Sequence, residues 1–81
     1  MKNWIKVERA KKNITQADLA EVLQVSRQTI SSIEKGRFVP STLLALRLAY
    51  YFGVRVEEIF FLEEEEKEMG NEISEREKGK Q

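Results

Sequence analysis

The segment from Val25 to Ser41, VSRQTISSIEKGRFVPS, carries polar side chains that can recognise the edges of DNA bases. The guanidinium group of Arg27 suits guanine and the amide group of Gln28 suits adenine, because each can form a pair of hydrogen bonds with that base. The hydroxyl side chains beside them are short and would let a helix backbone approach a duplex closely. No acidic residue occurs between Glu21 and Glu34. By itself this composition would also suit a helix face exposed to solvent, so its meaning depends on the elements that position the segment.

Five short helices are predicted upstream of Leu62, and they must position this segment. The first runs from about Asn3 to Lys12, the second begins after Thr15, the third follows Ser26 and ends at Glu34 or Lys35, the fourth follows Ser41 and ends at Gly53, and the fifth covers about Val56 to Phe60. The hydroxyl groups of Thr15, Ser26 and Ser41 suit helix N-caps, and Asp18 completes a weak capping box with Thr15. Glycine at positions 36 and 53 suits the residue that follows a helix end.

The periodicity of the apolar residues is clearer in some of these helices than in others. The clearest stripe lies in the fourth helix and comprises Leu44, Ala45, Leu48, Ala49 and Phe52. The stripe of the first helix is thin and imperfectly periodic, with Trp4, Ile5, Val7 and Ala10. Within the third helix, Ile30 and Ile33 are expected to point inward, which leaves its polar side chains outside. The fold class expected is therefore all-α.

The second and third helices, with a break of about three residues between them, have the lengths of a helix-turn-helix. In that arrangement the first helix crosses the phosphate backbone and the second lies in the major groove of DNA. The outer face of the third helix must then be polar without being acidic, as it is here.

The composition excludes several kinds of chemistry. The chain has 81 residues, no cysteine and no histidine, so it has no disulfide, no thiolate or imidazole metal site and no histidine acid–base catalysis. It also lacks a Gly-rich phosphate loop and a pair of inward carboxylates, so neither an enzyme nor a cofactor is expected. No apolar run approaches the ~18 residues of a membrane span, and no signal peptide is seen. We therefore expect no membrane contact and a cytoplasmic location.

Charge divides the chain into two parts. Residues 1–56 carry ten basic groups and four acids, a net charge of +6, whereas residues 57–81 carry ten glutamates and four basic groups, a net charge of −6. A basic body favours a polyanionic partner. We predict a DNA-binding domain over residues 1–62 and an acidic tail over residues 63–81. The tail would serve solubility, compete for the basic face, or bind another protein.

Three motifs, TQADLA, VSRQTIS.IE.G and P...ALRLA..F, resemble the Cro-type, or xenobiotic-response-element, helix-turn-helix family. The resemblance covers roughly Ile5 to Phe61. It implies a five-helix bundle of the lambda-repressor type and a transcriptional regulator, usually dimeric on a palindromic operator. A short C-terminal strand is compatible with it. Glu8 departs from the pattern, which often has an apolar residue there, so the first helix would roll slightly or Glu8 would pair with a nearby cation.

The resemblance also implies roles for individual positions. Contacts with base edges fall on Arg27, Gln28, Ser31 and Ser32. Contacts with the DNA backbone fall on Gln16, Ser26, Thr29, Lys35 and Arg37, and Gln16 would also brace the third helix. Arg9 and Glu34 match a partly buried ion pair. Simpler roles stay open: Arg27 and Gln28 as solvated residues, Thr29 bonded back to a helix carbonyl, and Lys35 and Arg37 as charges near a helix end.

Two good base contacts in one copy would not select one site in a genome, so a homodimer on an inverted repeat is expected. Apolar candidates for its interface are Tyr51, Phe60, Phe61 and Leu62, and the segment IFFLEE could pair with a neighbour as an extended strand. Alternatively, Phe60 and Tyr50 complete the core. The expected function is that of a sequence-specific transcriptional regulator, a repressor, that binds a double-stranded DNA operator. The alternatives are an antitoxin of the same fold and a protein-interaction module with no DNA role.

Overall fold

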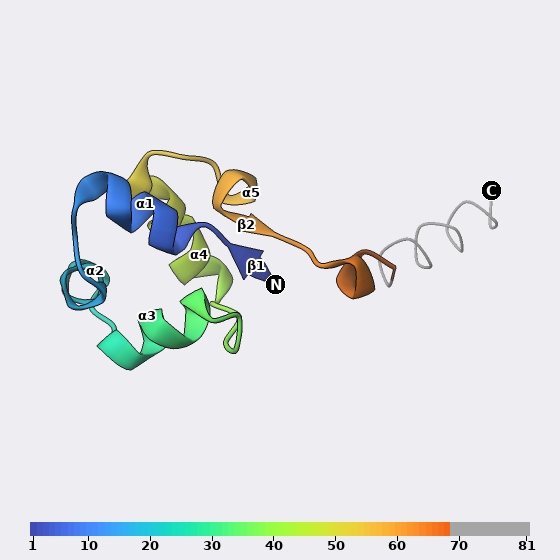
Figure 1. The fold of residues 1–81 in the computed structure, drawn as a ribbon, viewed down its shortest axis with the longest axis horizontal. Helices are drawn as coiled ribbons and strands as arrows, with labels where there is room; N and C mark the ends of the chain where they lie inside the picture. The colour runs from blue at the N-terminus through green and yellow to red at the C-terminus, as the bar shows by residue number, and fades with distance from the viewer. Residues whose placement is uncertain (69–81) are drawn as a thin grey trace.

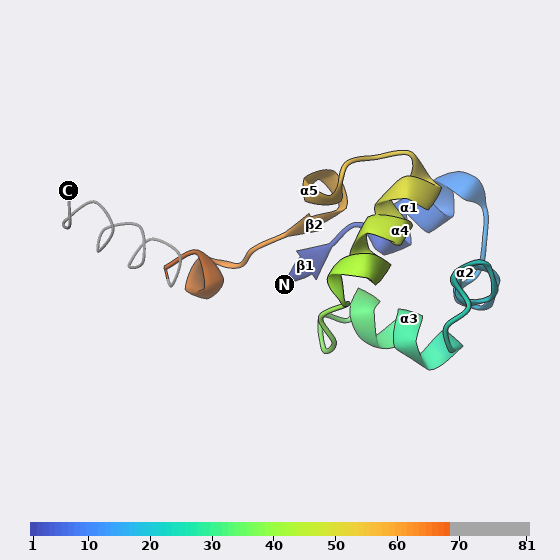
Figure 2. The same ribbon diagram turned by 180° about the vertical axis from the view of Figure 1, so that it is seen from behind.

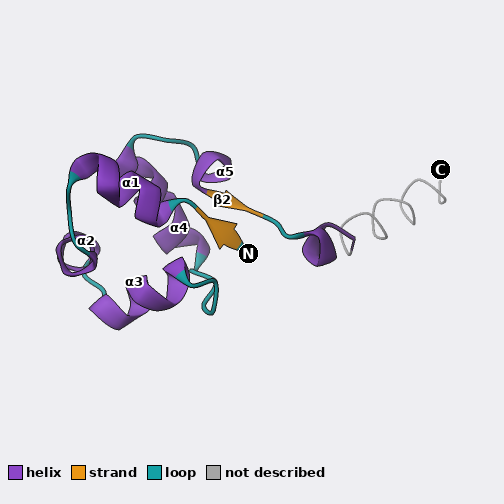
Figure 3. Ribbon diagram, in the orientation of Figure 1, coloured by secondary structure: helices purple, strands orange, loops and turns teal. Residues whose placement is uncertain are grey.

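The computed structural model describes residues 1–68, and within them short helices pack around one core (Figures 1 and 3). In chain order the elements are β1 (Lys2–Asn3), α1 (Ile5–Lys12), α2 (Gln16–Leu23), α3 (Arg27–Glu34), α4 (Thr42–Phe52), α5 (Val56–Ile59) and β2 (Phe60–Phe61). The two strands pair antiparallel. The all-α class with a short C-terminal strand is therefore confirmed.

Side-chain caps start three of the helices at the predicted residues. The hydroxyl of Thr15 accepts a hydrogen bond from the Asp18 N–H at 3.0 Å, and the Asp18 carboxylate accepts one from the Thr15 N–H at 2.9 Å. Ser26 caps α3 by accepting from the Thr29 N–H at 3.0 Å. Ser41 caps α4 in the same way, with the Leu44 N–H at 3.1 Å.

The turn between α2 and α3 depends on a left-handed residue. Gln24 has φ 58° and ψ 43°, and its N–H donates to carbonyls at the end of α2. This conformation turns the chain within three residues, so that α3 lies across the view in Figure 1 while α2 is seen nearly end-on. Gly36, with φ 74°, redirects the chain after α3, and a Cβ there would stand 3.4 Å from the Met1 carbonyl oxygen.

Buried residues from every helix form the core. The twelve are Ile5, Leu19, Ala20, Leu23, Ile30, Ile33, Leu44, Leu48, Ala49, Phe52, Ile59 and Phe60. Ile30 and Ile33 are 0% and 1% exposed, so one face of α3 is anchored in the core. The opposite face of this helix must then point outward.

Both ends of the folded part differ from the sequence prediction. The first helix begins at Ile5 rather than Asn3, because Asn3 belongs to β1 and pairs with Phe60. Of its expected inner set only Ile5 is buried, while Trp4, Val7 and Ala10 are exposed. The fifth helix ends at Ile59 rather than Phe60, because Phe60 enters β2. Pairing between distant segments sets these boundaries.

The IFFLEE segment pairs with the amino terminus of its own chain. Lys2 lies opposite Phe61 and Asn3 opposite Phe60, and the Trp4 and Phe61 rings are 5.6 Å apart. Within this chain, the first strand therefore fills the role that a neighbouring molecule was expected to fill.

The described part of the acidic tail leads away from the amino-terminal half of α3 (Figures 1 and 2). Residues 64–68 are helical, and Glu66 lies 3.4 Å from the amino group of Met1. The remaining tail residues, 69–81, lie outside the described part of the chain.

The capping box of α2 makes a prediction about pH. Hydrogen bonds from the Thr15 N–H and hydroxyl hold the pKa of Asp18 below its ordinary value of 3.8. The stabilisation from the ionised carboxylate is therefore present above that ordinary value, and it is lost as the pH falls through the lowered one. Asp18→Asn should lower the melting temperature at about pH 7. At about pH 2 the melting temperatures of the variant and the wild type should converge.

Circular-dichroism melts across that range measure the effect. Glu21→Gln, which alters another exposed acid of α2, is the matched control. Equal melting temperatures for Asp18→Asn and wild type near neutral pH would contradict the capping role.

Candidate DNA-binding surface

The outer face of α3 brings the four predicted base-contacting residues together. Arg27 and Gln28 are exposed, and Ser31 and Ser32 are half-buried beside them. One shallow hollow is lined by Arg27, Gln28 and Ser31, and a second by Ser26, Gln28, Thr29, Ser32 and Phe38. The hydroxyls therefore line hollows between longer side chains, where a base edge can approach the backbone.

The predicted backbone-contacting residues surround this face. Lys35 and Arg37 are exposed on the two sides of Gly36, at the end of α3. Ser26 lies at the other end of the helix, and its hydroxyl is 2.8 Å from that of Thr29. The Thr29 hydroxyl is thus held by the capping serine. Cations and hydroxyls of this kind are the usual donors to DNA phosphates.

A buried carboxylate joins α3 to the rest of the domain. Glu34 accepts hydrogen bonds from Arg9 Nε at 2.6 Å and from Arg9 Nη2 at 3.1 Å. The side chains of Arg9 and Glu34 are only 14% and 7% exposed. The hydrogen bond to Glu34 raises the pKa of Arg9 above its ordinary value, against the opposing effect of burial. The predicted ion pair is therefore present, and it is bidentate.

Gln16 extends this network to α2. Its amide nitrogen donates to Glu34 Oε1 at 3.1 Å, while Arg9 Nη1 donates to the Ile14 carbonyl at 3.0 Å. The carboxylate therefore connects α1, the first turn of α2 and the last residue of α3, and Arg9 joins the loop after α1 to the same network. An amide nitrogen carries two donors, so Gln16 can brace Glu34 and still offer an N–H to a phosphate.

The network also decides the charge of the surface. Glu34 is the only acid in α3, and Arg9 neutralises it. The remaining charges along the helix and the turn after it belong to Arg27, Lys35 and Arg37, all exposed. This surface is therefore positive, as contact with phosphates requires.

Two residues near this surface were not predicted. Asn3 donates from its side-chain amide to the Ile33 carbonyl at 2.8 Å and so caps the end of α3 from β1. No sequence pattern indicates this contact, because thirty residues separate the two groups. Phe38, 49% exposed, lines a hollow with Gln28 and Ser32. The sequence signal available for Phe38 was its place two residues after Gly36, which ends the helix.

The predicted interface residues lie in different environments. Phe60 is buried in the core, Tyr51 and Phe61 are half-buried, and Leu62 is 49% exposed. Tyr51 also has the Lys12 ammonium group 5.1 Å from its ring centre. The expectation that Tyr50 completes the core is wrong, because this side chain is 89% exposed.

Comparison with known families places the chain in a defined class. The family model described as "Helix-turn-helix" matches residues 5–59, which span α1 to α5. The chain therefore belongs to this helix-turn-helix family, and the resemblance noted in the sequence is confirmed. Within residues 1–68, no helix has the length and apolar character needed to cross a membrane.

Similar proteins come from archaea and bacteria. An uncharacterized HTH-type transcriptional regulator, MJ0272, of Methanocaldococcus jannaschii is 54% identical over 66 residues, which are 82% of this chain and all of that protein. YgzD of Bacillus subtilis, with the same description, is 48% identical over 80% of this chain and 98% of its own length. A third such regulator, from Archaeoglobus fulgidus, is 46% identical over 82% of this chain and 93% of its own length.

The buried ion pair makes a prediction about stability. Arg9→Met would leave Glu34 charged and without its main partner in a largely buried position. We expect a loss of about 3 kcal/mol in the free energy of unfolding, measured by urea denaturation. The matched control is Lys11→Met, which breaks a more exposed pair on the same helix, Lys11–Glu8 at 3.0 Å. That variant should lose less than about 1 kcal/mol. Equal losses in the two variants would contradict the anchoring role of Glu34.

Proposed function

We propose that this protein is a sequence-specific regulator of transcription that binds duplex DNA as a homodimer and represses by occupying its operator. Residues 1–62 form the DNA-binding unit, and residues 63–81 form an acidic tail outside it. The single observation that carries the proposal is the outer face of α3. It presents Arg27 and Gln28 to solvent while the one acid of the helix is buried against Arg9.

In the proposed complex, α3 enters the major groove and reads bases directly. Arg27 donates two hydrogen bonds to a guanine, and Gln28 makes two with an adenine. Ser31 and Ser32 lie against the bases between them, where their small size permits a close approach. Each bidentate contact contributes about 1–3 kcal/mol of discrimination.

Phosphate contacts supply most of the affinity in this mechanism. Lys35 and Arg37 bind the backbone beyond the end of α3, and Ser26 and Thr29 bind it beyond the beginning. Gln16 contacts a phosphate from α2, which crosses the backbone as the first helix of the motif does. Since Gln16 also hydrogen-bonds Glu34, the same contact fixes the depth of α3 in the groove.

Selection of bound duplexes from a random pool tests the base contacts. We expect an inverted repeat whose half-sites lie about 34 Å apart, one turn of the double helix. Arg27→Ala should weaken binding to the selected site by about 5- to 150-fold per half-site and relax the preference at one position. Arg55→Ala, which removes an exposed arginine outside the motif, is the control. Selection of a single asymmetric site, or an unchanged preference in Arg27→Ala, would contradict the proposal.

The phosphate contacts are tested by salt dependence. Lys35→Ala should lower the affinity for selected and unselected duplexes alike, because a phosphate contact carries no base information. It should also reduce the slope of log K against log salt by about one per half-site. Lys11→Ala, on α1, should leave the slope unchanged. An unaltered slope in Lys35→Ala would remove this residue from the binding surface.

A further inference from the structure

The outer face of α4 exposes apolar side chains that the core does not use. Among residues 1–68, the four most exposed large apolar side chains all lie between positions 39 and 50: Tyr50 at 89%, Leu43 at 68%, Val39 at 60% and Leu46 at 52%. Leu43, Leu46 and Tyr50 follow one another at helical spacing and so share one face of α4. We call these three residues the α4 stripe.

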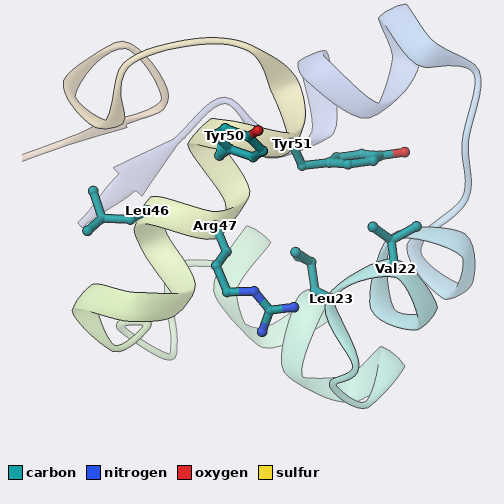
Figure 4. A pocket seen from close by; sticks show the side chains of 6 residues that line it. All are labelled: Val22, Leu23, Leu46, Arg47, Tyr50 and Tyr51. Carbon is teal, nitrogen blue, oxygen red and sulfur yellow. The ribbon is translucent and has the colours of Figure 1, made fainter.

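A shallow groove continues the α4 stripe toward α2. It is lined by Val22, Leu23, Leu46, Arg47, Tyr50 and Tyr51 (Figure 4). Tyr51 extends across the groove toward Val22, whereas Arg47 points toward Leu23 and away from Leu46 (Figure 4). The guanidinium group therefore lies beside the α4 stripe rather than on it.

Few charged residues lie near the outer face of α4, so this face could be buried at low cost. No acidic residue occurs between Glu34 and Glu57, and Arg47 is the only charged residue between Arg37 and Arg55. The centres of protein interfaces are depleted in charge and enriched in tyrosine and arginine. An exposed apolar face of this kind, on a small domain, marks a contact surface.

The α4 stripe does not coincide with the DNA-binding surface. Figure 2 shows α4 in front of the domain and α3 along its lower edge, and in Figure 4 the groove opens above α3. A protein bound to α4 would therefore leave the outer face of α3 accessible to DNA. This separation is what a dimer that binds DNA requires.

We propose that the α4 stripe is the surface on which a second copy of this chain binds, with the two α4 helices antiparallel about a two-fold axis. The inference rests on the proposed function, which requires a second copy. In this arrangement Leu43 of one copy faces the partner's Tyr50, and the reverse contact repeats it, as an isologous interface demands. The two Leu46 side chains lie near the axis between these contacts.

The acidic tail suits this surface less well than a second copy does. Residues 63–81 contain eight glutamates, and the one cation that lines the groove, Arg47, points toward Leu23 rather than onto the α4 stripe. Carboxylates placed against apolar side chains would lose hydration without gaining a partner. Two α4 stripes bury only apolar side chains against each other.

Charge substitutions within the α4 stripe test the proposal by sedimentation at micromolar concentrations. Leu43→Glu puts an acid in the first turn of α4, and Tyr50→Lys puts a cation in its last turns, positions where the helix dipole favours those charges. Both side chains are exposed, so thermal melts should stay near wild type. We expect each single variant to dissociate at least about 100-fold more readily than wild type, since an unpaired charge would be buried in both copies.

The double variant tests the antiparallel arrangement. Leu43→Glu combined with Tyr50→Lys would place each new carboxylate opposite a new ammonium group of the partner, so the dimer should be recovered in part. Val7→Glu and Leu62→Glu, which alter exposed apolar residues on α1 and after β2, should remain dimeric.

Several results would overturn the proposal. These are a monomeric wild type both alone and on duplex DNA, a dimeric Leu43→Glu variant, a monomeric Leu62→Glu variant, or a double variant that stays dissociated. Binding to a half-site duplex separates this inference from the proposed function. Monomeric Leu43→Glu should still bind one half-site, because α3 is unaltered. A wild-type dimer that binds no duplex would overturn the proposed function, and the substitutions would still locate the interface.

Discussion

The arrangement of this domain depends on the carboxylate of Glu34. It receives two hydrogen bonds from Arg9 and one from Gln16, so the last residue of α3 is tied to α1 and to the first turn of α2. The same contacts neutralise the only negative charge of α3, so the outer face of this helix carries no unpaired acid. The position of α3 and the charge of its outer face therefore depend on the same ion pair, and loss of this pair would disturb both. Because the pair is largely buried, removal of either side chain would leave the other charge poorly hydrated and without a partner.

An eight-residue helix has little stability of its own, so α3 exists because the rest of the domain holds it. Ile30 and Ile33 anchor one face in the core, Ser26 caps the beginning, and Asn3 satisfies a carbonyl near the end. These contacts leave the side chains of Arg27 and Gln28 exposed on the outer face of α3. If α3 binds DNA and α4 binds the second copy, the core separates these two surfaces.

Local signals predicted much of this structure. The caps at Thr15, Ser26 and Ser41 and the stop at Gly53 depend on neighbouring residues only, and each lies where the sequence indicated. The ends of the fold were less predictable, because the pairing of β1 with β2 joins segments that are far apart in the sequence. For the same reason the Asn3 contact was missed. The α4 stripe was missed for another reason: α4 is apolar on nearly all sides, so its pattern does not separate core residues from exposed ones such as Leu43 and Tyr50.

The central claim is that the outer face of α3 is the surface that meets DNA. Nuclear magnetic resonance of the ¹⁵N-labelled protein, titrated with a duplex selected from a random pool, tests it most directly. We predict that the largest changes in amide chemical shift occur in residues 26–37 and at Gln16, with small changes along the outer face of α4. Large changes confined to α4, α5 or residues 63–68, with α3 unaffected, would contradict the account.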